Sequence, residues 1–433
     1  MNPTELLQQL IRFDTTNPPG NEKKCILWIK ELLDKAGIRN TILSKDPERP
    51  NIIARIEGQK KAPPLLIYGH VDVVSTKGQQ WTHSPFEGVI EDGFIWGRGA
   101  LDMKGGIAMM LSAFLKLAET GFKPSGDIIF AALSDEESGG DFGAKFLVEQ
   151  HPDYFKDVKY ALGEFGGFPV YIGGKCFYFI QTGEKQRCWM KATLNGPGGH
   201  GSQRHTGGTM AKLGKIIRTF DKKRMPVHVT PIVKDMVERI AGNVSLPERM
   251  VFKQILSPFF TDKIIDLMGE RGGMFDPLLH NTVNITMVNG GDKVNVIPSE
   301  ISFHMDGRIL PGFRPDDMLS EIRQLAGDGF SIEIQKHEPC PPKPDMALFN
   351  MLGGIIEKAH PGAIPVPFLL PGITDACFFS RLGIQTYGFL PMNLPKDFTF
   401  NKLIHAADER IPEYCLLFGT NAIYDVFKQY SGS

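Results

Sequence analysis

Three stretches between Pro64 and Gly140 constrain the fold most, because each places an apolar run beside a cluster of polar residues. They read PLLIYGHVDVV, WGRGALDMKGG and DIIFAALSDEESGG. In a parallel sheet the strands are buried and polar side chains gather at their C-terminal ends. We therefore expect one sheet edge to carry the imidazole and carboxylates of these stretches. These residues are His70, Asp72, Asp102, Glu136 and Glu137.

The surrounding sequence alternates between strand and helix patterns. Strands are expected at 51–56, 65–68, 127–133, 160–163 and 384–390, and helices at 107–117, 142–148, 348–360 and 411–429. This rhythm predicts an α/β fold with a mixed, mostly parallel sheet flanked by helices. Four glycines surround Asp102, which suggests close backbone packing or positive φ angles there.

A different pattern begins near Cys188. Strands are expected at 188–194, 281–288, 300–308 and 330–335, with helices at 210–220 and 315–326. Their order, β-α-β-β-α-β, is the ferredoxin-like arrangement. Residues 221–271 are expected to be irregular and helical in parts, as an insertion after the first helix. We therefore predict a catalytic domain in two parts, 1–184 and 339–433, with an inserted α+β domain at 185–338.

Composition narrows the classes of function. The 433 residues include 48 Lys+Arg and 49 Asp+Glu, so no basic excess points to nucleic acid or to an anionic membrane surface. A small-molecule or short-peptide substrate is the expected partner. The six cysteines are scattered without a CxxC pair, which is typical of reduced thiols in a cytoplasmic protein. No apolar run approaches the roughly 20 residues of a membrane span.

Taken one at a time, the polar motifs have ordinary explanations. His70 and Asp72 lie two apart on an extended segment and share a face, which also fits a simple hydrogen-bonded pair. Asp102 could be a helix N-cap. Glu136 and Glu137 repel each other unless a proton or a cation offsets their charge. One could then bind a metal while the other serves as a general base, although a solvated acidic loop is the alternative.

Together, the motifs resemble one family. The chain has His-x-Asp, then a glycine-flanked Asp, then Asp-Glu-Glu-x-Gly-Gly, then Glu164 in ALGEFGG, and finally His405. This order resembles the co-catalytic zinc peptidases and deacylases that include aminoacylase, glutamate carboxypeptidase, succinyl-diaminopimelate desuccinylase and acetylornithine deacetylase. WTHSPFEG, IWGRGALDMKGG and GFKPSGDI look most like the branch of carboxypeptidase S and the fatty-acyl amino acid hydrolases.

The resemblance implies a zinc-exopeptidase fold and a role for each motif residue. His70 and Glu164 would bind one zinc ion, His405 and Glu137 a second, and Asp102 would bridge both. Asp72 would orient His70, and Glu136 would take a proton from the bridging water and pass it to the leaving amine. Zinc is implied at two ions per chain, although nitrogen and oxygen ligands also accept Co²⁺ or Mn²⁺. A cis peptide bond is implied after Asp102.

Residues of the second half are implied as well. His200, in GPGGHGS, would stabilise the oxyanion, often from the other subunit of a dimer, although it could simply be a surface histidine. Asn295 and Arg308 would hold a substrate carboxylate, with a strand-edge ion pair as the alternative. Gly372 and Thr374, in LLPGITDACFF, match a substrate-binding loop. Ile373 and Cys377 depart from the usual residues of that loop, which leaves substrate choice open.

The sequence therefore predicts a metal-dependent hydrolase of the amide bond in short peptides or N-acyl amino acids, next to a free carboxylate. Exopeptidase, dipeptidase and aminoacylase or deacylase activity stay open. Two rivals are a catalytically inactive binding protein of the same fold and a single-metal enzyme. The inserted domain would serve as a lid and dimerisation domain, unless the insertion at 221–275 covers that surface and keeps the chain monomeric.

Overall fold

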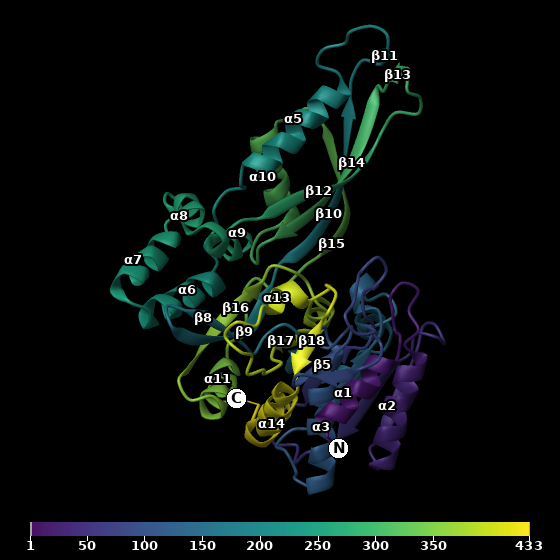
Figure 1. The fold of residues 1–433 in the computed structure, drawn as a ribbon, viewed down its shortest axis with the longest axis vertical. Helices are drawn as coiled ribbons and strands as arrows, with labels where there is room; N and C mark the ends of the chain where they lie inside the picture. The colour runs from purple at the N-terminus through teal and green to yellow at the C-terminus, as the bar shows by residue number, and fades with distance from the viewer. Residues whose placement is uncertain (1, 433) are drawn as a thin grey trace. The chain divides into compact units, whose positions relative to one another are not determined.

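The computed structural model describes residues 2–432, which fall into two compact units. The first unit comprises the chain up to Thr182, Asp345–Phe368, and the residues from Thr374 onward. The second comprises Gly183–Pro344 and Leu369–Ile373. Figure 1 shows the elements of both.

A mixed sheet forms the centre of the first unit, with strand order β1-β2-β6-β3-β7-β17-β9-β16 and β8 beside β9. Its middle strands β6, β3, β7 and β17 run parallel, whereas β1, β2 and β9 pair antiparallel at the flanks. The prediction of an α/β fold with a mostly parallel central sheet is thus confirmed. The strands are β1(Asn40–Leu43), β2(Asn51–Ile56), β3(Leu65–His70), β6(Ile128–Leu133), β7(Tyr160–Gly163), β8(Phe168–Ile172), β9(Lys175–Glu184), β16(Ala363–Leu370) and β17(Gln385–Gly388).

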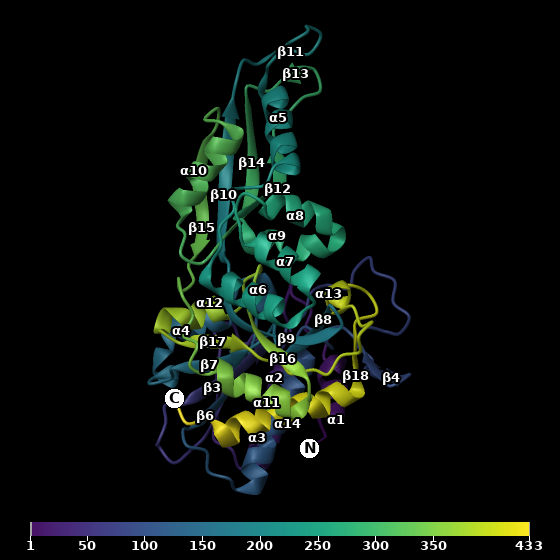
Figure 2. The same cartoon turned by 90° about the vertical axis from the view of Figure 1, so that its left-hand side faces the viewer.

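Five helices of the described chain pack on one side of this sheet and share one apolar core with it. They are α1(Pro3–Arg12), α2(Lys23–Lys35), α3(Lys104–Thr120), α11(Phe349–Ala359) and α14(Glu413–Gln429). Figure 2 shows α11 and α14 beside α3. α3 is apolar on most of its surface and is buried along most of its length, as expected of a helix that other elements surround. The short helices α4(Ala144–Gln150) and α12(Ala376–Phe379) contact each other elsewhere in the unit.

The glycines around Asp102 have the tight surroundings that the sequence suggested. Gly99 has a φ of +87°, and a Cβ atom on Gly105 would lie 2.2 Å from the carbonyl oxygen of Ala100. The loop can therefore fold closely onto the start of α3 only with glycine at these positions.

A small sheet joins two distant loops of the first unit. β5(Phe94–Trp96) pairs with β4(Val89–Glu91) on one side and with β18(Arg410–Pro412) on the other. This pairing brings the residues just after β5 close to those just before β18.

The second unit contains an antiparallel sheet of order β12-β14-β10-β15. Alternate residues of β10 are buried against α5 and α10, so the side chains of one sheet face form this unit's core. The chain order is β10(Gln186–Asn195), α5(Thr209–Lys222), β12(Thr282–Asn289), β14(Glu300–Ile309), α10(Pro315–Ala326) and β15(Ser331–Glu338).

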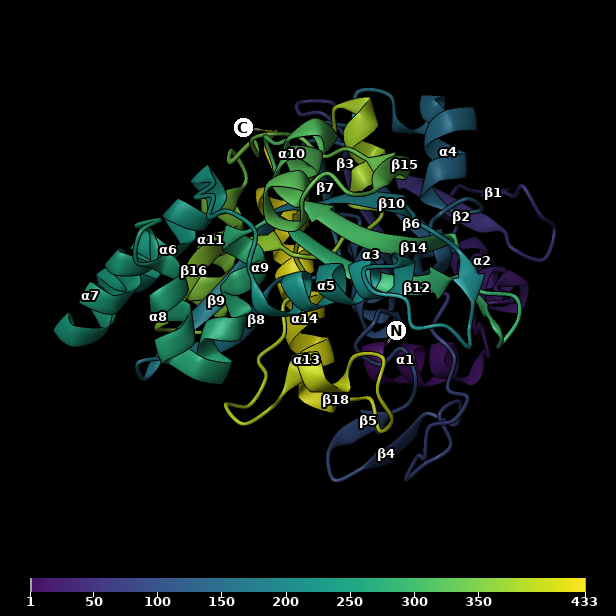
Figure 3. The ribbon, with the colours of Figure 1, turned by 90° about the horizontal axis from the view of Figure 1, so that it is seen from above.

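The insertion between α5 and β12 is more regular than the sequence suggested. It folds into α6(Pro231–Asn243), α7(Leu246–Ile255), α8(Thr261–Met268) and α9(Asp276–Leu279), and Figure 3 shows α6, α7 and α8 grouped together. Thr230 caps α6, and Ser245 forms a capping box with Glu248 at α7. These caps satisfy the first amide groups of each helix, and proline follows each cap within the first turn.

β16 was not predicted from the sequence, because its residues AIPVPFLL include two prolines. β16 lies at an edge of the sheet, where a residue without an amide donor is tolerated. The missed β8 and β9 form a hairpin next to it. Among residues 2–432, the helices are too short or too polar to cross a lipid bilayer.

Candidate metal centre

The central parallel strands deliver their polar residues to one edge. His70 is the last residue of β3, Glu136 and Glu137 lie in a short 3-10 turn after β6, and Glu164 directly follows β7. β3 pairs in parallel with both β6 and β7, so these strand ends are neighbours. Asp102 and His405 reach the same place from the loops that β5 and β18 hold together.

The His70 imidazole is held from both nitrogens. Nδ1 lies 2.9 Å from the backbone oxygen of Asp72, to which it donates a hydrogen bond. The neutral ring then has its lone pair on Nε2. That nitrogen faces two carboxylate oxygens, at 3.2 Å from Asp102 Oδ1 and 3.4 Å from Glu164 Oε2. A lone pair facing two anionic oxygens requires a proton or a cation between them.

His405 repeats this arrangement on the other side of Asp102. Its Nε2 lies 3.1 Å from Asp102 Oδ2 and 3.3 Å from Glu137 Oε1. The two oxygens of Asp102 therefore face one imidazole each. Asp102 is the shared member of two nitrogen and oxygen clusters, and the peptide bond that follows it is cis, as the resemblance implied.

These clusters fit zinc ions. Ligand atoms about 2.0–2.2 Å from a tetrahedral zinc ion lie about 3.3–3.6 Å from one another, close to the four separations given above. Glu137 Oε1 and Glu164 Oε2 are buried and accept no hydrogen bond within the described chain. A bound cation would supply the missing partner of each. Two three-residue groups of the described chain have ligand atoms close enough together to hold a metal ion: His70 with Glu136 and Glu164, and His70 with Asp102 and Glu137.

Burial and neighbouring charges shift the pKa values of the residues in these two clusters. Burial and the charge of Asp102 raise the pKa of Glu137 to about 7. The nearby carboxylates of Asp102 and Glu137 raise the pKa of His405 to about 10. Asp102 has a strongly lowered pKa, because its hydrogen bonds to His405 and His70 outweigh the effect of burial. The metal-free site therefore holds protons where a cation would otherwise sit.

Glu136 lies close to His70 and Glu164. One of its oxygens is within 4.8 Å of the corresponding atoms of His70 and Glu164. Burial, and then the charge of Glu164, raise the pKa of Glu136 well above that of an ordinary glutamate. A carboxylate of raised pKa next to a reacting water is suited to accept a proton.

Asp72 contacts both His70 and the turn that follows β6. Its backbone oxygen accepts a hydrogen bond from His70 Nδ1, and its Oδ1 lies 3.5 Å from the same nitrogen. The carboxylate also accepts the backbone N–H groups of Glu136 and Glu137, each at 3.2 Å. It thus fixes the turn that carries these two glutamates.

Glu409, which was not predicted from the sequence, holds the loop of Asp102 in place. This buried carboxylate accepts the backbone N–H groups of Gly99, Leu101 and Asp102 at 2.7–3.0 Å. It also pairs with Arg98 at 2.7 Å. A buried arginine within the glycine-rich run WGRGA was a signal that an acidic partner was needed, but nothing in the sequence indicated which acid it was.

Asp375 was also missed, although it directly follows the predicted Thr374. Both of its carboxylate oxygens are buried, and neither has a hydrogen-bond partner among the residues that the structure describes. Burial and the charge of Glu164 raise its pKa well above the usual value, which favours a neutral carboxylic acid. Thr374 itself is buried and accepts the N–H of Ala376 at 3.1 Å.

Apolar side chains close one side of the centre. Asp102 and Glu164 share a cavity of about 10 Å³ with seven apolar residues. A cavity needs about 10–15 Å³ to admit a water molecule, so this one has room for one water molecule at most. The apolar residues are Leu101, Met103, Phe165, Leu390, Met392, Phe400 and Ile404.

The remaining predicted residues belong to the second unit, where they do not form one group. His200, in β11(Gly199–His200), pairs with β13(Val296–Ile297), and the N–H of Gly201 bonds to Asn295 O at 2.8 Å. Arg308 lies near the other end of β14, about 27 Å from Glu300 at about 3.4 Å per residue. Its guanidinium forms a two-point ion pair with Asp306, at 2.8 and 3.0 Å. Gly372 belongs to the short return segment Leu369–Ile373.

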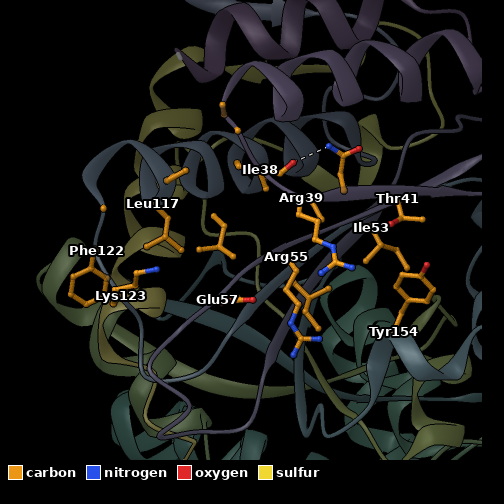
Figure 4. Close-up of a pocket in the computed structure, with 18 of the residues that line it drawn as sticks. Ile38, Arg39, Thr41, Ile53, Arg55, Glu57, Leu117, Phe122, Lys123 and Tyr154 are labelled. Carbon is orange, nitrogen blue, oxygen red and sulfur yellow. Dashed lines mark hydrogen bonds between the residues drawn. The ribbon is translucent and has the colours of Figure 1, made fainter.

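A roomier cavity of the first unit, of about 720 Å³, lies away from the metal centre. Figure 4 shows Arg39 and Arg55 from the β1 and β2 side of this cavity, with Leu117, Phe122 and Lys123 from the end of α3 and the residues after it. None of the predicted site residues lines it.

Comparisons with known proteins agree with the motifs. The family model described as Peptidase family M20/M25/M40 matches residues 66–429. A probable carboxypeptidase S-like protein 2 of Dictyostelium discoideum is 29% identical over 80% of this chain and 68% of its own length. The human N-fatty-acyl-amino acid synthase/hydrolase PM20D1 is 26% identical over 80% of this chain and 70% of its length.

Among solved structures, an M20 family metallo-carboxypeptidase from Sulfolobus solfataricus matches the fold with a TM-score of 0.70. The two chains are 19% identical, and the match covers 99% of each. The family and the branch predicted from the motifs are therefore confirmed.

Proposed function

The chain belongs to peptidase family M20/M25/M40, and from this premise we propose that it hydrolyses the amide bond of N-acyl amino acids or short peptides next to a free carboxylate. One observation supports this most strongly. Two imidazole nitrogens each face two carboxylate oxygens, and the two oxygens of Asp102 are shared between them. Glu136 lies close to His70 and Glu164, where it could transfer a proton.

Two zinc ions would be held by His70, Glu164 and Asp102 on one side and by His405, Glu137 and Asp102 on the other. When bound, they would polarise the scissile carbonyl and acidify the water between them. Cobalt or manganese would also suit this ligand set.

The chain's own residues would carry the proton through the reaction. Glu136 accepts a proton from the attacking water as the new carbon–oxygen bond forms. It then gives that proton to the amide nitrogen as the carbon–nitrogen bond breaks. The burial that raises its pKa makes it a stronger base when ionised and a competent acid afterwards. The apolar wall beside Asp102 and Glu164 limits competing access of water.

The substrate would be recognised through its carboxylate and its apolar portion. Arg308 offers a planar fork for a carboxylate, and in the free chain Asp306 occupies that fork. A substrate carboxylate would replace or share this partner. The name of one relative, an N-fatty-acyl-amino acid synthase/hydrolase, favours an apolar acyl group.

We further propose a homodimer formed through the second unit, which would serve as a lid and dimerisation domain. His200 and Asn295 lie at the opposite end of the sheet from Arg308, so one small substrate held by Arg308 cannot touch them in the same chain. A second copy would supply them. A sedimentation mass of one chain under conditions of full activity would rule out this part of the proposal.

The test is turnover of a panel of N-acyl amino acids and dipeptides by zinc-loaded protein, alongside Glu136→Gln. We expect some members to be cleaved and the variant to lose about 10²–10⁴-fold in kcat while it keeps two zinc ions per chain. Loss of zinc from the variant would mean that Glu136 is a ligand. A variant as active as the parent would remove Glu136 from the mechanism.

A further inference from the structure

A segment near the N-terminus lies against the residues that follow His70. The N–H of Asn17 donates to Val73 O at 2.9 Å, and the N–H of Val73 donates to Thr15 O at 3.1 Å. The hydroxyl of Thr15 donates to Val71 O at 2.6 Å. The segment therefore continues the parallel pairing beyond the end of β3 and holds Asn17 next to the metal centre.

The Asn17 side chain joins two carboxylates with one amide nitrogen. Its Nδ2 donates to Asp72 Oδ2 at 2.8 Å and to Asp135 Oδ1 at 3.0 Å. All three side chains are buried, with Asn17 5% exposed. Both hydrogens of the amide group are thus used, one for each acid.

Asp72 and Asp135 both fix the turn of Glu136 and Glu137, Asp72 through backbone N–H groups within the turn and Asp135 through one beyond it. Asp72 accepts the backbone N–H groups of both glutamates. Asp135 directly precedes them with a φ of +71°, and its Oδ2 accepts the N–H of Phe142 at 3.1 Å, beyond the turn. Asn17 connects the two anchors.

The far end of this network is also buried and paired. Asp135 Oδ1 receives Arg49 Nη1 at 3.0 Å, and Arg49 in turn pairs with the buried Glu22 at 2.7 Å. Gly20, at a φ of +84°, allows the backbone to lie close to the Arg49 side chain, because a Cβ atom there would lie 2.2 Å from Arg49 Nε. Residues 17–22 therefore contribute both ends of a single buried network.

We propose that Asn17 is a positioning residue that fixes the Glu136–Glu137 turn relative to His70. The inference rests on the proposed function, because it assigns Asn17 to the same metal centre. Asparagine suits this place because it donates two hydrogen bonds and carries no charge. Alanine would leave two buried carboxylates facing each other, and aspartate would add a third acid without donors.

The test compares Asn17→Ala with a matched variant, Asn281→Ala. Asn281 is buried in the second unit, donates to Glu321 Oε2 at 3.0 Å and accepts the N–H of Leu310 at 2.8 Å. Both variants remove a buried amide that bonds to a carboxylate, but only Asn17 contacts the proposed centre. Zinc affinity is measured by chelator competition, followed by kcat and KM on a cleaved substrate and by thermal unfolding.

We expect Asn17→Ala to weaken zinc binding and lower kcat by about 10–100-fold each, with little change in KM. Asn281→Ala should match it in lost Tm and keep the zinc affinity and kcat of the parent. Asn17→Asp, which keeps the volume and removes the donors, should lose at least as much as Asn17→Ala. Equal zinc affinity and kcat in Asn17→Ala and Asn281→Ala would overturn the proposal.

The zinc measurement separates this inference from the proposed function. If the parent binds two zinc ions but cleaves no member of the panel, the proposed substrate class fails. The zinc affinity of Asn17→Ala would then still decide whether Asn17 positions the turn. Unchanged zinc affinity in both Asn17 variants would reject the role even if the parent is active.

Discussion

Each unit of this chain places a buried histidine between carboxylates, but the two arrangements differ in one respect. In the first unit, Nε2 of His70 faces two carboxylates while Nδ1 is committed to a backbone oxygen. In the second unit, each nitrogen of His280 has its own acid, with Nδ1 3.0 Å from Asp276 and Nε2 3.1 Å from Asp262. Arg224 adds a positive charge next to Asp276.

The difference separates a metal site from an ion pair. A doubly protonated His280 satisfies both acids, so no lone pair or unpartnered oxygen is left for a cation. At His70 and His405, one nitrogen meets two carboxylate oxygens, and buried oxygens of Glu137 and Glu164 accept no hydrogen bond from any described residue. Whether a buried histidine can bind a metal ion therefore depends on how the nearby acids are divided between its two nitrogens. It depends less on the number of those acids.

The largest expected effect comes from removing one histidine of each kind. His70→Ala should lose at least one of two zinc ions per chain and about 10³-fold or more in activity, since it removes a ligand and its charge balance. His280→Ala should keep both zinc ions and most of the activity. Zinc content by atomic absorption and turnover measure both. Loss of zinc in His280→Ala would contradict the description of His280 as part of an ion pair and not of a metal site.

The pH dependence of zinc binding should sharpen the comparison. The nearby carboxylates of Asp102 and Glu137 raise the pKa of His405 to about 10, so the metal-free site is protonated at neutral pH. Zinc must displace that proton, and its affinity should rise about tenfold or more per pH unit between pH 6 and 8. Competition with a chelator of known pH dependence measures this. A zinc affinity independent of pH would show that zinc displaces no proton from the site.

The smallest effect concerns the stability supplied by His280. Asp276 and Asp262 raise the pKa of His280 above its usual value, against the opposing effect of burial. Its stabilising charge is therefore fully present below about pH 6.5 and is lost as the pH rises through the raised value.

The stability difference between the parent and His280→Gln should shrink accordingly from pH 6 to pH 9. Asp262 is half exposed, so solvent screens the pair and the difference should be about 1 kcal/mol, or about 2–4 °C in Tm. A difference that grows with pH would give the opposite sign and reject the ion-pair description.

Much of the fold and the outline of the centre could be predicted from the sequence. The ends of β3, β6 and β7 were predictable because buried apolar runs stop at a polar residue, at His70, after Leu133 and at Glu164. The ligand assignments came from a resemblance, since Asp102 alone fits a helix cap and Glu136–Glu137 alone fits an exposed loop.

The supporting residues could not be predicted, because they depend on contacts between distant segments. Glu409 contacts the loop of Asp102 only because β18 pairs with β5. Asn17 contacts Asp72 and Asp135 only because the segment after α1 continues the sheet pairing. β16 was missed because two prolines argue against a strand unless the strand lies at a sheet edge.

The two-metal site at Asp102 is tested most directly by anomalous diffraction at the zinc edge from crystals of zinc-loaded protein. The geometry predicts two peaks that share Asp102, one beside His70 and Glu164 and the other beside His405 and Glu137. No peak at Asp102, or a peak at His280 instead, would contradict the account of how this chain distinguishes a metal site from an ion pair.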